Sequence, residues 1–245
     1  MQIEKDFVLE ASGFLTFSEQ VVHPEPEINY LEDARHVFMD QTQDSDHKIL
    51  YFVYRGVVLK DHRELFDSFG LRHDLTVIYP GKIGAEFIKT VGSFNPPKHN
   101  SSETYPEYYE VLAGEALFIL QKNSRSGEVE EIMAIEAKKN DKVFIPPGFG
   151  HIIVNPIDQP LITASIVEKN LKPTTEPFAN KQGAAYYYVE TASGRGDFVK
   201  NPNYHNSVGL KIMAAPTLEQ PVEMPCEKTL YDNFIDHPDL LNILK

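Results

Sequence analysis

The sequence of 245 residues has few features that would place it outside the cell or in a membrane. It contains one cysteine, Cys226, so an internal disulfide is excluded and a reducing compartment is expected. It has no apolar run of membrane-spanning length and no charged-then-apolar leader at its start. These absences predict a cytoplasmic protein without membrane contact.

Basic residues are also scarce: 23 lysines and arginines stand against 36 acidic residues, a formal net charge of -13. This balance argues against nucleic acid as a partner, because its phosphates would be repelled. An anionic small molecule is compatible with the charge only if local donors bind it. Hydrophobic residues make up 42% of the chain, which is enough for a core, and the length favours one domain with extensions over two domains.

The stretch from Thr76 to His151 is the most informative part of the chain. It consists of short apolar runs, each stopped by proline or glycine: the run from Thr76 ends at Pro80-Gly81, and the next ends at Gly92. Residues 108–121 read as two strands, with Gly114 supplying the positive φ of a tight hairpin. This rhythm predicts a small antiparallel barrel or jelly roll.

The segments before this stretch predict an arm and short elements. Residues 1–18 alternate apolar and polar groups, as in an edge strand or a packing arm, and a proline-containing linker begins at His23. Asn29 is a candidate helix cap with Glu32 as its capping-box partner. Residues 48–59 read as a buried strand, and residues 61–69 as a short helix ended by Gly70.

The segments after it predict further strands and a helical end. Residues 161–167 continue the barrel, 171–181 read as a loop, and 183–190 as one more strand. In residues 229–245, leucines and Phe234 have helical spacing, and Pro238 divides the segment into two short helices.

Four motifs in this order resemble the cupin-type, archaeal-like glucose-6-phosphate isomerases: YPG at 79–81, TxG at 90–92, YPExYEVLxGEAxxxLQ at 105–121 and PPxxxH at 146–151. The resemblance implies an all-β cupin jelly-roll barrel with short peripheral helices in its extensions. The expected division is an N-terminal arm (1–47), the barrel (48–190) and a C-terminal extension (191–245). It also implies a homodimer that interconverts glucose 6-phosphate and fructose 6-phosphate in glycolysis and gluconeogenesis.

The resemblance implies a divalent metal site, and this sequence lacks half of it. The family's His-x-His, which follows the glycine matched by Gly92, is replaced here by Ser93-Phe94-Asn95. Glu107 and His151 match the remaining two ligands. We therefore expect either a weakly bound Fe, Mn, Zn or Ni ion or no metal.

His99 offers one route to a rebuilt metal site, because its loop could fold back toward Glu107. The alternative interpretation is a solvated loop histidine. His151 and Glu107 are likewise open to a structural interpretation, as a hydrogen-bonded strand histidine and a salt-bridged or capping carboxylate.

The resemblance also implies a phosphate pocket made by Tyr51, Thr76, Thr90 and the backbone of Gly92. Hydroxyls and a close backbone N–H are suitable donors for a phosphate dianion in a partly dry pocket. Each threonine, taken alone, is equally explained as a common strand residue.

For catalysis, Glu107 or Glu86 is the candidate base that moves a proton between C1 and C2, and Tyr109 matches a tyrosine lining the sugar site. Residues 173–178 stand where the family often has a His-Asp-Tyr-like segment. Three hypotheses follow: a sugar-phosphate isomerase with a rearranged metal site, a catalytically inactive phosphosugar-binding or sensing cupin, and a metal-independent sugar isomerase or epimerase.

Overall fold

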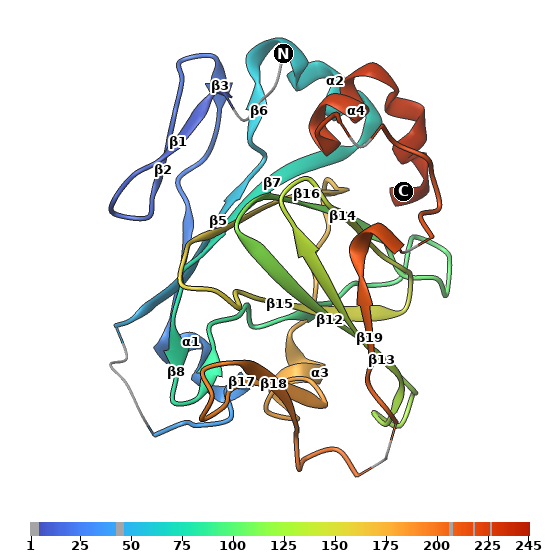
Figure 1. The fold of residues 1–245 in the computed structure, drawn as a ribbon. Coiled ribbons are helices and arrows are strands. Elements are labelled where there is room, and N and C mark those ends of the chain that lie inside the picture. Colours follow the sequence, from blue (N-terminus) through green and yellow to red (C-terminus); the bar gives the residue numbers. More distant parts are fainter. Residues whose placement is uncertain (1–4, 43–46, 206–207, 218, 226) are drawn as a thin grey trace.

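Two facing β-sheets form the body of the molecule (Figure 1). The computed structural model describes residues 5–42, 47–205, 208–217, 219–225 and 227–245, so Cys226 lies outside the described residues. The larger sheet has the order β14-β11-β16-β7-β5-β4 and the smaller one β10-β15-β12-β13-β19. All pairings within them are antiparallel except that of β13 with β19. This is the predicted all-β cupin jelly roll.

The strands of the larger sheet are β4 (Glu27–Tyr30), β5 (Ile49–Arg55), β7 (Leu71–Ile78), β11 (Glu107–Ala113), β14 (Lys142–Ile145) and β16 (Leu161–Glu168). Those of the smaller sheet are β10 (Ser93–Phe94), β12 (Glu115–Asn123), β13 (Val129–Lys138), β15 (Phe149–Val154) and β19 (Lys211–Ala214). Both predicted extensions therefore supply barrel strands, because β4 comes from residues 1–47 and β19 from residues 191–245.

The hairpin predicted at Gly114 is wrong. β11 pairs with β14 and β16 in the larger sheet, whereas β12 pairs with β13 and β15 in the smaller one. Gly114 has φ 83°, as expected, but it turns the chain from one sheet to the other. A Cβ at this position would lie 3.0 Å from the carbonyl oxygen of Pro160, which is a second reason for glycine.

Three smaller sheets cover the ends of the barrel. One pairs β1 (Phe7–Leu9) with β2 (Leu15–Phe17), and another pairs β3 (Val21–Val22) with β6 (Val58–Leu59). The third has four strands in the order β18 (Gly196–Lys200), β17 (Tyr186–Glu190), β9 (Glu86–Phe87) and β8 (Lys82–Ile83). The helices are short: α1 (Leu31–Ala34), η2 (Arg35–Val37), η3 (Lys60–His62), α2 (Arg63–Phe69), α3 (Glu176–Ala179), η4 (Ala215–Thr217), α4 (Leu230–Asp236) and η5 (Pro238–Leu244). In Figure 1, α2 and α4 lie together at one end of the barrel, and α1, α3, β17 and β18 at the other. No helix in the described ranges is long and apolar enough to cross a membrane.

The local predictions had mixed outcomes. The helix ended by Gly70 is confirmed as α2, with Gly70 at φ 63°. The capping box is wrong, because Asn29 lies in β4 and no side chain caps α1. The expected loop 171–181 contains α3, with Pro177 in its first turn.

The C-terminal segment folds as two short helices, as predicted, and packs into the chain's own core. The Thr229 side chain caps α4 by accepting from the Asp232 backbone N–H at 3.0 Å, and η5 begins at Pro238. Five apolar side chains of this segment are almost completely buried: Leu230, Tyr231, Phe234, Leu241 and Leu244. Ile235, Leu240 and Ile243 are half-buried. The five buried side chains are used within the chain's own core, and the homodimer stays a prediction.

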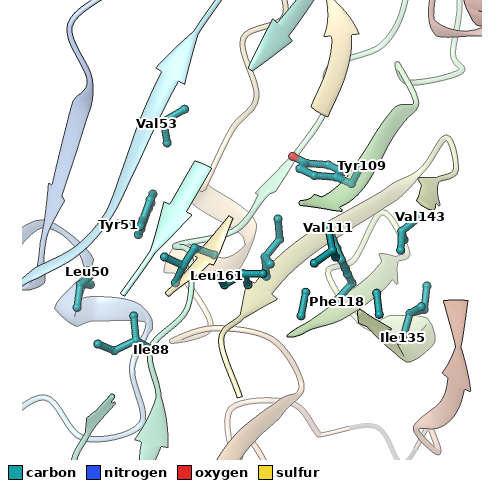
Figure 2. Packing of buried hydrophobic residues seen from close by; sticks show 14 of the residues in the cluster. Leu50, Tyr51, Val53, Ile88, Tyr109, Val111, Phe118, Ile135, Val143 and Leu161 are labelled. Carbon is teal, nitrogen blue, oxygen red and sulfur yellow. The ribbon is translucent and has the colours of Figure 1, made fainter. Parts of the chain in front are cut away.

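The core between the two sheets positions the functional cavity. Figure 2 shows part of this cluster, in which Tyr51 and Val53 of β5 and Tyr109 of β11 belong to the same packed group as Phe118 of β12. The alternation of strand residues brings these side chains to the inner face. Polar side chains on the same inner faces, described next, form the cavity.

Candidate functional site

A cavity of about 380 Å³ lies inside the barrel and is lined by side chains of both sheets. Its volume falls in the range of about 300–1,000 Å³ that is usual for small-molecule sites. Seven residues predicted for the site line it: Tyr51, Thr76, Thr90, Gly92, Glu107, Tyr109 and His151. The structure thus brings together residues that are as much as 100 positions apart in the sequence.

Strand register explains this convergence. Thr76 of β7 is paired with Val53 of β5, which lies two residues from Tyr51 and faces the same side. Glu107 and Tyr109 are also two residues apart and face inward from β11. On the opposite sheet, His151 of β15 is paired with Ser93 of β10.

One end of the cavity contains a chain of hydrogen bonds. The Asn95 side-chain amide donates to Glu107 Oε1 at 2.6 Å, and the Tyr109 hydroxyl donates to Glu107 Oε2 at 3.0 Å. His151 Nε2 lies 3.0 Å from the same Tyr109 hydroxyl. Asn95 also donates to the backbone carbonyl of Tyr105 at 2.8 Å, so its amide nitrogen is held between two acceptors.

Burial determines the protonation states of His151 and Tyr109 in these hydrogen bonds. It lowers the pKa of His151, although the Glu107 carboxylate opposes the shift, so the imidazole is neutral near pH 7. Burial, reinforced by Glu107, raises the pKa of Tyr109 well above its ordinary value. The single hydroxyl proton of Tyr109 is used in the hydrogen bond to Glu107, so His151 must donate to the Tyr109 oxygen through Nε2. Its Nδ1 is then the unprotonated nitrogen.

The other end of the cavity has the predicted phosphate residues. The Thr90 hydroxyl oxygen accepts from the Ile153 backbone N–H at 3.0 Å, which leaves its own proton for a ligand. The Tyr51 hydroxyl accepts from the Val91 N–H at 3.4 Å, and burial raises the pKa of Tyr51 to about 12, so it remains a donor.

Glycine is required at position 92. Gly92 has φ 79°, and a Cβ there would overlap the Ile152 side chain and lie 2.9 Å from the His151 carbonyl oxygen. The backbone therefore comes close to β15 at this point.

The residues present do not fit a metal ion. Both oxygens of Glu107 already accept hydrogen bonds, and His151 Nε2 faces Tyr109. Ser93, beside His151, offers a hydroxyl, while the amide nitrogen of Asn95 faces Glu107. Among the described residues, no group of three or more His, Cys, Asp or Glu is placed to hold a metal.

Two predicted site residues lie away from the cavity. His99 is exposed in the loop after β10, and the structure does not bring it to Glu107 and His151. Glu86 is buried in an ion pair with Lys89 and accepts from the Met39 backbone N–H at 2.7 Å. Glu86 lies outside the cavity lining, and these contacts indicate a structural carboxylate.

The sequence reasoning missed four charged residues that line the cavity: Asp33, Arg55, Arg72 and Asp74. The sequence could have indicated Arg55, because it follows Tyr51 and Val53 at a spacing of two on a buried strand and so lies on the same face as Tyr51. Asp74 precedes Thr76 in the same way. Residues 173–178, which replace the family's His-Asp-Tyr-like segment, also reach the cavity through Pro173 and Thr175.

Comparison with known proteins places this geometry in a family. A family model described as glucose-6-phosphate isomerase (GPI) matches residues 28–206. The glucose-6-phosphate isomerase of Pyrococcus horikoshii is 27% identical over 184 residues, covering 73% of this chain and 88% of that protein. The one from Thermococcus litoralis is 34% identical over 87 residues, covering 36% of this chain and 40% of that protein.

Solved structures add little to this comparison. An oxalate oxidase in complex with the substrate analogue glycolate aligns at 16% identity with a TM-score of 0.35, covering 44% of this chain and 47% of that chain. A likeness of this size supports no argument about function. The family match covers well over half of the sequence and includes the residues that line the cavity, and on that basis the chain belongs to the glucose-6-phosphate isomerase (GPI) family.

Proposed function

We propose that this protein binds a hexose 6-phosphate in the barrel cavity and interconverts its aldose and ketose forms, with glucose 6-phosphate and fructose 6-phosphate as the substrate pair. The observation that carries the proposal is the convergence of a donor-rich end and an acid–base end in one cavity. Family membership supports the same pair of sugars.

In this proposal the phosphate binds at Tyr51, Thr76, Thr90 and Gly92. The Tyr51 and Thr90 hydroxyls each accept from a backbone N–H, which orients their protons away from that N–H. Neutral donors suit the phosphate because the chain as a whole is acidic, so binding has to come from local contacts.

At the other end, the Glu107 carboxylate acts as the base. It takes the proton from C2 of the open-chain aldose, which leaves an enediolate with its negative charge on O1. The O2 proton then moves to O1, and the carboxylic acid of Glu107 returns its proton to C1 to give the ketose. Tyr109 hydrogen-bonds to both Glu107 and His151, so it can pass a proton between the carboxylate and the imidazole. No step of this scheme uses a metal ion.

One observation favours a second function, that of a phosphosugar-binding protein without turnover. Both Glu107 oxygens are engaged by donors of the protein, so the carboxylate has to release or share one of these hydrogen bonds before it can take a proton from a substrate. The phosphate end is unaffected by this argument.

The experiment that tests the proposal is an isomerase assay on the metal-stripped protein, repeated after addition of Mn²⁺, Fe²⁺ or Zn²⁺, with calorimetric titration of glucose 6-phosphate. We expect turnover without added metal. Binding without turnover in any condition would support the second function, and absence of binding would contradict both. Light scattering of the same sample tests the homodimer, which we also propose.

A further inference from the structure

Two guanidinium groups line the cavity on the same side as Tyr109, and nothing in the proposed chemistry has used them. Arg55 of β5 is paired with Asp74 of β7, Asp74 with Ser165 of β16, and Ser165 with Tyr109 of β11. These four side chains form one cross-strand row, and all of them line the cavity. The row therefore connects Arg55 to the acid–base end.

This row is separated from the phosphate end by the length of a sugar. Arg55 lies two residues beyond Val53, which is paired with Thr76. At about 3.3 Å per residue, the row is displaced by roughly 7 Å along the strand from Thr76. A hexose bound by its phosphate near Thr76 would extend its C1 and C2 oxygens toward Arg55.

The charge of Arg55 is only partly neutralised. Arg72 holds Asp74 through two short contacts, Nε to Oδ1 and Nη2 to Oδ2, both 2.8 Å, and the Gly56 N–H donates to Asp74 Oδ1 at 2.9 Å. Arg55 Nη1 reaches Asp74 Oδ2 only at 3.6 Å. The buried carboxylate of Asp74 is thus mainly engaged by Arg72.

The other counter-ion of Arg55 is at the surface. Glu27 accepts from Arg55 Nε at 2.7 Å and from Nη2 at 3.0 Å, but its side chain is 56% exposed, so water screens its charge. The Arg55 side chain is 42% exposed and retains Nη1 donors on the cavity side. Glu107, the remaining carboxylate of this end, is engaged by Asn95 and Tyr109.

We propose that Arg55 binds the oxygens on C1 and C2 of the sugar phosphate, so that the cavity prefers ligands with negative charge at that end. During isomerisation this charge develops on the enediolate oxygens, and a phosphorylated aldonic acid carries it permanently. The inference rests on the proposed function, because it takes the phosphate to be bound near Thr76 and Thr90.

Two stable ligands test this inference directly. Gluconate 6-phosphate carries a carboxylate at C1, whereas glucitol 6-phosphate is neutral there and otherwise alike. In calorimetric titrations of the full chain, we expect gluconate 6-phosphate to bind about 10- to 100-fold more tightly, which is the usual gain from a hydrogen bond to a charged group. Arg55→Met should abolish this preference, because it weakens gluconate 6-phosphate far more than glucitol 6-phosphate, whose oxygens on C1 and C2 are uncharged hydroxyls.

Glu27→Gln is the matched variant that leaves Arg55 in place, and it keeps the test informative if Arg55→Met does not fold. Removal of the surface counter-ion should increase the preference for gluconate 6-phosphate. Equal affinity of the wild type for the two ligands, or a preference that survives Arg55→Met, would overturn the inference while leaving the proposed function standing. If neither ligand binds the wild type, both fail.

Discussion

Two buried glutamates that look alike in the sequence should respond in opposite ways to the same substitution. Glu107 lies in the cavity and Glu86 below it, and both are nearly inaccessible to solvent. Glu107→Gln keeps the size of the side chain and removes its charge. The Asn95 amide nitrogen is fixed as a donor by the Tyr105 carbonyl, so the new glutamine oxygen must face Asn95 and its NH₂ must face Tyr109.

The hydrogen-bond chain can absorb this change. The Tyr109 oxygen would accept from the introduced amide and donate to His151 Nε2, which requires the imidazole proton to move to Nδ1. The number of hydrogen bonds is conserved, so we expect the free energy of unfolding at pH 7 to change by no more than about 1 kcal/mol. Loss of the base should lower kcat about 10²- to 10⁴-fold.

Glu86→Gln should do the reverse. Its carboxylate is the partner of Lys89, which is itself buried and lies over the rings of Phe38 and Tyr187 at 4.8 and 5.2 Å. Breaking a buried pair by removing one partner costs about 3–5 kcal/mol. The activity per folded molecule should stay the same, because Glu86 does not line the cavity.

Urea unfolding followed by circular dichroism measures the free energy of unfolding of each variant, and a coupled isomerase assay measures its kcat. Nitrogen NMR of the histidine rings reports the tautomer shift at His151. The reasoning is refuted if Glu107→Gln retains full kcat, or if Glu86→Gln loses kcat without losing stability.

Three further predictions follow from the same geometry. Thr76→Val and Thr90→Val should each weaken glucose 6-phosphate binding by about 1–3 kcal/mol in calorimetry. Only Thr90→Val should also lower the stability of the fold, because it leaves the Ile153 N–H without its acceptor. Unchanged binding would mean that both threonines are only strand residues. Burial lowers the pKa of His73 to about 4 from 6.5, so the unfolded chain binds the proton more tightly and stability is lost as the pH falls from 6.5 toward 4. This amounts to about 3 kcal/mol, and urea midpoints of His73→Gln should show a shallower pH dependence, whereas an unchanged slope would contradict the assignment. Ser93→His combined with Asn95→His should create a tight Mn²⁺ or Zn²⁺ site with Glu107 and His151, measurable as bound metal after dialysis and absent from Ser93→His alone.

The sequence predicted those parts of the molecule whose cause is local. The Gly70 helix end and the Thr229 and Pro238 helix starts depend on a few neighbouring residues, and the structure has them where they were expected. Gly114 shows the limit. Its positive φ could be predicted from the residue type. Whether the flanking strands pair with each other depends on the partners of β11, which are roughly 30 to 60 residues away in the sequence.

The site follows the same division. The inward position of the cavity residues could be read from strand alternation and motif order. The sequence could not show that Asn95 and Tyr109 occupy both oxygens of Glu107, because these hydrogen bonds depend on side chains that meet across two sheets. Asn29 failed as a helix cap for a related reason: pairing with Tyr51 in β5 outweighed its capping preference.

The packing of the C-terminal helices has a consequence for how the chain is made. One of its core clusters contains Leu15 near one end of the chain and Leu244 near the other. The Tyr231 hydroxyl accepts from the Leu59 backbone N–H at 3.0 Å, a contact between residues 172 positions apart. During synthesis this part of the core therefore stays open until residues 230–244 have left the ribosome, and such intermediates expose apolar surface. A chain that stops before Thr229 would expose Phe66, whose ring packs against Tyr231 and Phe234. We therefore expect premature termination to yield an aggregation-prone product rather than a shorter working barrel.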